Sequence, residues 1–80
     1  MTSDQLRHHR ISMGLSQATL GRLMGLRPEH VCRIETTREP TQQQSAVVLA
    51  LVHIHRYGLL PRLLAEISTQ NTITKTGENQ

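Results

Sequence analysis

Apolar residues recur at intervals of three and four along most of the chain, the spacing that places them on one face of an α-helix. A first helix is expected from Ser3 or Asp4, either of which can serve as its N-cap, to a stop at Gly14. Its inward stripe is Leu6, His9, Arg10 and Met13.

A second and a third helix follow at once. The second, of about eight residues, is expected between the natural N-cap Ser16 and Gly25. The third begins at Arg27-Pro28, because proline suits the first helical position, and runs to about Glu35. Residues 36–40 form a loop closed by Pro40. The inward positions of these two helices are Leu20, Leu23, Met24, Val31 and Ile34.

The C-terminal half predicts two more helices and a tail. Thr41, with Gln44 three residues later, matches a capping box and starts a helix that ends near Tyr57-Gly58. Apolar residues cover nearly all of its circumference, so it either fills the centre of the domain or gives one face to a partner subunit. A fifth helix is expected from Pro61, with Leu60, Leu63, Leu64 and Ile67 on one stripe.

The predicted organisation is one domain over 1–69 and a polar, aperiodic stretch over 70–80 that is expected to be disordered. The apolar surplus of residues 42–69 is where a dimer contact is expected. The candidates for that contact are Val48, Val52, Leu60 and Leu64.

Composition narrows the function. With 80 residues there is room for one small domain and little room for a deep substrate cleft, so an enzyme is not expected. Tyr57 is the one aromatic residue, and a core built from aliphatic side chains favours an all-α fold. No catalytic constellation is evident. Neither a small-molecule ligand nor a cofactor is expected.

Cellular location follows from what the chain lacks. A single cysteine, Cys32, can form neither an internal disulfide nor a multi-thiolate zinc site, which favours a reduced, cytoplasmic setting. The N-terminal MTSDQLRHHR has no apolar segment of a secretory signal, and the longest apolar run, residues 46–52, is far below the ~20 residues of a membrane span.

Residues 16–35 have the spacing of a helix-turn-helix. Gly21 sits where the second helix approaches the third, and Gly25 sits at the turn, where a positive φ is needed. The shared apolar seam is supplied by Leu20, Leu23, Val31 and Ile34.

Over residues 6 to about 57 the chain resembles the lambdoid phage repressor and Cro-like family, also called the Xre family, most specifically in MGLSQATLGRLMG, HVCRIE and the loop ending at Pro40. The resemblance implies a four- or five-helix, usually dimeric DNA-binding domain whose third helix enters the major groove. It also implies that Arg10 and Glu35 form a buried ion pair. Residues carried over to the DNA surface are Gln17, Arg27 to His30, and Arg33.

Helical geometry points to the same surface. If Val31 and Ile34 face inward, a step of about 100° per residue places Glu29 and Arg33 on the opposite face, with His30 and Cys32 beside them. Arg33 can bind guanine and Glu29 can accept from cytosine N4, although either could be a solvated charge. The candidates for base contacts are Arg27, Glu29, His30 and Arg33.

Other polar residues suit the phosphate backbone or a structural role. Phosphate contacts are expected from Ser16, Gln17, Thr36, Thr37 and Arg38, although the Ser16 hydroxyl is more readily used as a helix cap. Five histidines invite a metal site, but His8-His9 are adjacent and His53 and His55 lie about 200° apart on a helix, so no metal is expected. Cys32 either reports redox state or simply fills a helix shoulder.

The leading interpretation is a sequence-specific regulator, a repressor of its own promoter, that binds an inverted-repeat DNA operator as a homodimer in the bacterial cytoplasm or in a phage-infected host. A Cro-like phage or mobile-element regulator, an anti-CRISPR-associated autorepressor and an antitoxin of a toxin–antitoxin pair all fit. In a different class, the fold could serve as an adaptor that binds another protein through its apolar helices.

Overall fold

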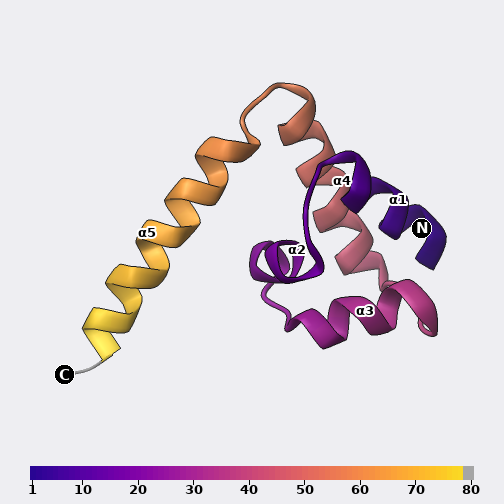
Figure 1. Cartoon of the computed structure of the whole chain (residues 1–80), viewed down its shortest axis with the longest axis horizontal. Coiled ribbons are helices and arrows are strands. Elements are labelled where there is room, and N and C mark those ends of the chain that lie inside the picture. The colour runs from indigo at the N-terminus through magenta and orange to yellow at the C-terminus, as the bar shows by residue number, and fades with distance from the viewer. Residues whose placement is uncertain (79–80) are drawn as a thin grey trace.

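The computed structural model describes residues 1–69 in full and the backbone of 70–78. It is all-helical over that range, as the sequence predicts, with five helices and no strand (Figure 1). The helices are α1 (Ser3–Ser12), α2 (Gln17–Met24), α3 (Pro28–Thr36), α4 (Gln42–Arg56) and α5 (Leu60–Glu78). Helices α1 to α4 pack into one body, and α5 diverges from it after the bend that follows α4 (Figure 1).

Helix ends follow the local signals with two exceptions. The side chains of Ser16 and Thr41 cap α2 and α4, and α3 has its proline in the first turn, all as predicted. The cap of α1 was placed wrongly at Ser3 or Asp4. It is Thr2, whose Oγ1 accepts from the Gln5 backbone N–H at 3.1 Å while Thr2 N–H donates to Gln5 Oε1 at 2.9 Å. Helix α5 begins one residue before the proline that was expected to start it.

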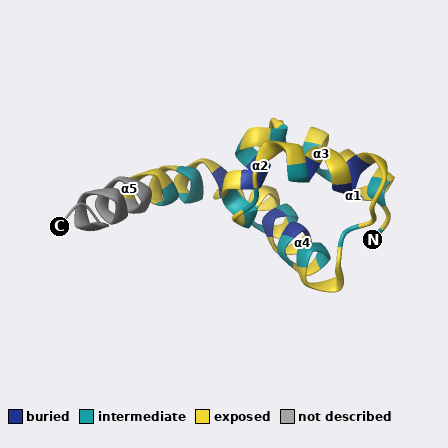
Figure 2. Ribbon diagram, turned by 90° about the horizontal axis from the view of Figure 1, so that it is seen from below, coloured by how far each residue is buried: buried dark blue, intermediate teal, exposed yellow. Residues whose placement is uncertain are grey.

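The core lies where α1 to α4 converge, with buried positions turned toward one another (Figure 2). It is built from aliphatic side chains without a ring, consistent with the composition. The fully buried members are Leu6, Leu20, Ile34, Val31 and Val48. Around them lie the almost fully buried Met13, Leu15, Leu51 and Leu60.

Two of the four residues expected at a dimer contact are instead part of this core. Val48 is 0% exposed and Leu60 is 3% exposed, so neither can meet a partner without unfolding the domain. Val52 and Leu64 are half-buried and pack against the core from its edge. The prediction failed for Val48 because α4 has apolar residues on nearly every side, so its sequence pattern does not indicate which side the other helices cover. It failed for Leu60 because this first residue of α5 packs into the core beside the bend that follows α4.

Gly21 is the position where α2 and α3 come closest. A Cβ added there would stand 2.5 Å from the backbone oxygen of Leu26 and 3.3 Å from Val31 Cγ2. The obstructing oxygen belongs to the backbone of the turn, which moves less easily than a flexible side chain.

Gly21→Ala is therefore expected to lower the free energy of unfolding by about 1–2 kcal/mol, because overpacking outweighs the helix propensity that alanine gains. Urea denaturation followed by circular dichroism measures the change. Ala18→Ser, on the exposed side of the same helix, serves as the control and should change stability little. Equal stability of Gly21→Ala and the wild type would contradict the close approach.

No described helix is by itself long and apolar enough to cross a bilayer. Helix α4 and the start of α5 reach that composition only as a pair, and the chain is bent by 118° between them. Helix α5 extends past residue 69, where the polarity pattern placed the end of the domain. The side chains of the expected disordered tail, 70–80, lie outside the described residues, so its disorder stays a prediction.

Candidate nucleic-acid interface

The turn between α2 and α3 fixes the direction of α3. Gly25 ends α2 in the left-handed region at φ 74°, which glycine adopts without strain. The Leu26 N–H then donates to the Gly21 carbonyl at 2.7 Å. Arg27 is the N-cap residue of α3, and its side chain makes no capping bond. The Arg27 guanidinium is therefore available to bind a partner molecule at the start of α3.

Helix α3 has one apolar side and one charged side. Val31 and Ile34 are 0% and 1% exposed and face the core, whereas Glu29 and Arg33 are exposed on the other side. The helical geometry inferred from the sequence is confirmed at these four positions.

The four candidates for base contacts come together at the start of α3. They line a shallow hollow of about 300 Å³ whose wall is formed by Gly25, Leu26, Arg27, Glu29, His30 and Arg33. His30 is half-buried there, and the three charged residues are exposed. The hollow thus combines two guanidinium groups, a carboxylate and an imidazole along the first two turns of α3.

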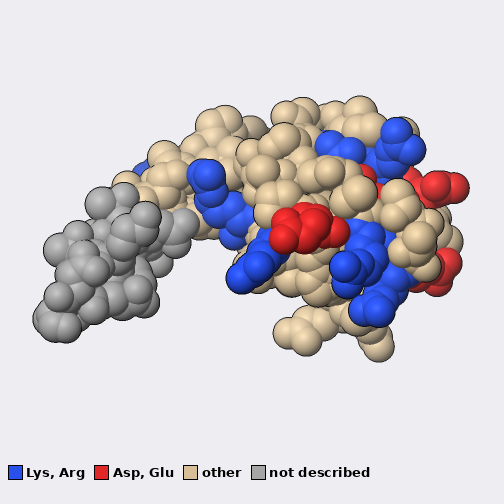
Figure 3. Space-filling view, turned by 60° about the horizontal axis from the view of Figure 1, so that its bottom comes forward, with Lys and Arg blue, Asp and Glu red and all other residues tan. Residues whose placement is uncertain are grey.

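The charge on this side of the molecule is mainly positive. When the bottom of the molecule in Figure 1, where α3 lies, is turned forward, arginine side chains gather there with acidic side chains between and beside them (Figure 3). Within residues 1–69 the one ion pair is Arg10–Glu35, so Arg27, Glu29 and Arg33 are not neutralised by a neighbour.

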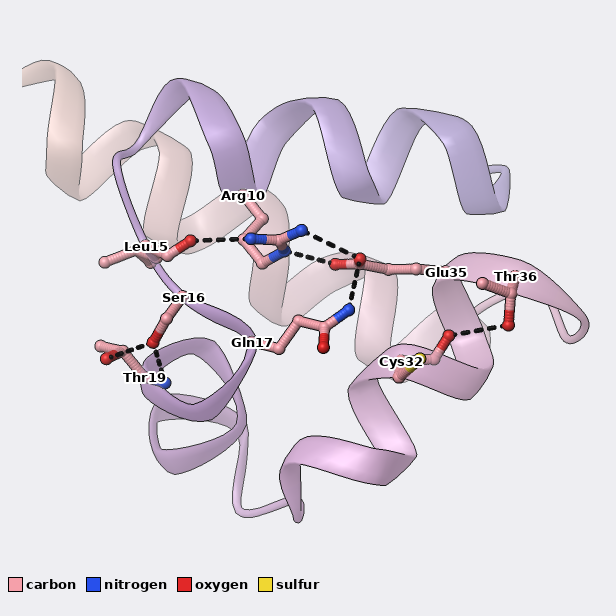
Figure 4. Close-up of polar contacts among 8 residues, drawn as sticks. All are labelled: Arg10, Leu15, Ser16, Gln17, Thr19, Cys32, Glu35 and Thr36. Carbon is pink, nitrogen blue, oxygen red and sulfur yellow. Dashed lines mark hydrogen bonds and ion pairs between the residues drawn. The ribbon is translucent and has the colours of Figure 1, made fainter.

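A buried polar network holds α1, α2 and α3 together behind this surface (Figure 4). Arg10 Nε donates to Glu35 Oε2 at 2.6 Å and Arg10 Nη2 donates to Oε1 at 3.1 Å, which makes a bidentate pair. The third guanidinium nitrogen, Nη1, donates to the Leu15 carbonyl at 2.9 Å. The side chains of Arg10 and Glu35 are 14% and 2% exposed, so the expected buried ion pair is confirmed.

Gln17 belongs to this network. Its Nε2 donates to Glu35 Oε1 at 3.2 Å, and the side chain is half-buried (Figure 4). The sequence placed Gln17 among the phosphate contacts, but the structure directs its amide inward to a carboxylate. The sequence did not indicate this inward hydrogen bond, because it depends on the position that Glu35 of α3 takes in the folded protein.

Three of the other four phosphate candidates also use their polar groups internally. Ser16 Oγ accepts from the Thr19 N–H and donates to Thr19 Oγ1, both at 3.0 Å, as the capping alternative predicted. Thr36 Oγ1 donates to the Cys32 carbonyl at 2.9 Å, and Thr37 Oγ1 donates to that of Arg33 at 3.3 Å. Each hydroxyl proton is thus donated within the protein. Arg38 is exposed, and no bond of its guanidinium is seen within residues 1–69.

The remaining candidate groups form no second site. Cys32 is a free, exposed thiol on the flank of α3. In the described part of the chain, no three His, Cys, Asp or Glu side chains come together as metal ligands.

No family model, curated protein or solved structure matches the chain.

Proposed function

We propose that the protein is a sequence-specific DNA-binding regulator in which α2 and α3 form a helix-turn-helix and α3 lies in the major groove. The observation that supports this most directly is the hollow at the start of α3, where Arg27, Glu29, His30 and Arg33 lie together on an exposed helix end. A major groove about 12 Å wide admits an α-helix in this position.

The side chains of this surface suit the edges of bases. A guanidinium can donate two hydrogen bonds to guanine O6 and N7, which is the role we assign to Arg33. Arg27, at the start of the helix, can reach a base or a phosphate. Because a carboxylate is unfavourable near phosphates, Glu29 is tolerated where a base amino group donates to it, and cytosine N4 is such a donor. Glu29 therefore acts chiefly against wrong sequences.

Phosphate binding falls to fewer groups than the sequence suggested. Arg38, in the loop after α3, supplies a free guanidinium, while Gln17, Thr36 and Thr37 donate their side-chain protons within the protein. Backbone N–H groups in the first turn of α2 offer a second phosphate contact, since only that of Thr19 is taken by the Ser16 side chain. Such contacts fix register rather than sequence.

A single α3 reads only a few base pairs, so useful specificity requires two copies on half-sites about 34 Å apart. We propose a homodimeric repressor that acts by occupying a promoter, its own included, in the bacterial cytoplasm and on the nucleoid. A phage or mobile-element regulator of the Xre type, such as a Cro-like or anti-CRISPR-associated autorepressor, and an antitoxin are the settings that this activity fits.

Salt dependence separates DNA binding from an adaptor that binds protein through apolar helices. A duplex selected from a random library is titrated with the protein at two salt concentrations, beside a shuffled duplex of the same composition. If the dimer neutralises about six phosphates, the affinity should fall about 10³-fold between about 50 and 200 mM salt, because bound counterions are released. Failure of the selection to enrich any sequence, or binding indifferent to salt, would overturn the proposal.

A further inference from the structure

An apolar groove lies between α4 and α5. The groove has a volume of about 340 Å³ and is lined by Ile54, Leu59, Arg62, Leu63 and Glu66. Leu59 is 51% exposed, and Ile54 and Leu63 are half-buried. The groove exists because Gly58, at φ 75°, lets the chain turn sharply between α4 and α5. The two helices are bent by 118° relative to one another (Figure 1).

The rim of the groove carries two opposite charges one helical turn apart. Arg62 and Glu66 are both exposed, and neither forms an ion pair within residues 1–69. Four residues of separation place them on the same side of α5, next to the apolar positions Leu59 and Leu63.

This arrangement is self-complementary. In a two-fold symmetric contact, if residue i of one copy contacts residue j of the other, then residue j of the first copy contacts residue i of the second. If two α5 helices run antiparallel about an axis at the level of residue 64, midway between the charges, Arg62 of each copy faces the partner's Glu66. The same axis brings the Leu63 side chains together and covers both copies of Leu59.

We propose that the α4–α5 groove is the contact between two copies of this chain, with the α5 helices antiparallel and two reciprocal Arg62–Glu66 pairs across the axis. The inference deepens the proposed function and rests on it in one respect, namely that reading two half-sites requires two copies. It also replaces the contact first expected at Val48 and Leu60, which are buried in the core.

Charge reversal with rescue tests the contact on the full chain, by sedimentation velocity over a broad concentration series without DNA. Arg62→Glu and Glu66→Arg should each raise the dimer dissociation constant about tenfold or more, because symmetry replaces two attractive pairs with two repulsive ones. The double variant Arg62→Glu/Glu66→Arg restores opposite charges and should return the constant to within about threefold of wild type. All these side chains are exposed, so circular dichroism should show intact folding.

Leu59→Asp should produce a monomer, because it places a carboxylate in the apolar centre of the contact. The matched control is Ile11→Asp on α1, where a side chain of similar exposure (57%) lies outside the groove and the dimer should persist. A monomeric wild type, an unchanged dimer in Leu59→Asp, or a double variant no better than the singles would overturn the interface.

Parallel titrations with the selected duplex keep the two proposals separate. A dimer that binds no DNA would refute the proposed function and leave the interface standing. A Leu59→Asp monomer that bound the full operator as tightly as the wild type would show that reading DNA does not need this contact.

Discussion

Replacing Arg10 by methionine should lower the free energy of unfolding by about 3–5 kcal/mol. The substitution leaves the Glu35 carboxylate, 2% exposed, without the guanidinium that neutralises it. It also removes the donor to the Leu15 carbonyl, which lies in the turn between α1 and α2. Domains unfold with a free energy of only about 5–15 kcal/mol, so the variant should retain little stability, and at the lower end of that range a large fraction of the molecules should be unfolded.

The double variant Arg10→Met/Glu35→Leu is the decisive control. Replacing both partners by apolar side chains of similar size removes the unpaired charge and should recover most of the lost stability, although Gln17 then loses its acceptor. Urea denaturation followed by circular dichroism measures both. If Arg10→Met alone cost less than about 1 kcal/mol, the pair would not be the link between α1 and α3 that its burial indicates.

Arg33→Ala should weaken binding to the selected operator by about 1–3 kcal/mol for each half-site, because each copy of the dimer loses a bidentate contact to guanine. Discrimination at one base pair of each half-site should relax, while binding to a shuffled duplex should change far less. Fluorescence anisotropy with the two duplexes measures both effects. The fold should be unaffected, since the Arg33 side chain is exposed.

Two variants distinguish geometry from charge. Arg33→Lys keeps the charge but not the planar fork, and should lose most of the discrimination. Arg56→Ala removes the same charge from the exposed end of α4 and should leave specificity unchanged. If Arg33→Ala and Arg56→Ala weakened binding equally, α3 would not be the reading helix.

Local signals in the sequence were enough for most of the framework. The capping box Thr41/Gln44, the cap Ser16, the proline that opens α3 and the glycine turn at Gly25 act over three or four residues, so their geometry is readable without the rest of the fold. The same holds for the side of α3 that carries Glu29 and Arg33, because a fixed rotation per residue relates it to the buried Val31 and Ile34.

Contacts between distant segments were beyond such local reading. The α1 cap is not such a case, because Thr2 and Gln5 have the same local spacing as Thr41 and Gln44, and the pattern was assigned to the wrong residue. Gln17 turns inward because a carboxylate from α3 arrives within hydrogen-bonding distance of its amide. The type of a polar residue and its position in the sequence do not show which hydrogen-bond acceptor lies nearest to it in the folded protein.

The sequence by itself determined the helical register of the chain, the close approach at Gly21 and the charged side of α3, because these depend on neighbours along the chain. The tertiary structure decided which apolar residues were left over for a partner. Val48 packs into the core because a helix that is apolar on nearly all sides, as α4 is, is sorted into core and surface only by the helices that pack against it. The bend after α4 likewise buries Leu60 and leaves Leu59 and Leu63 to line the groove.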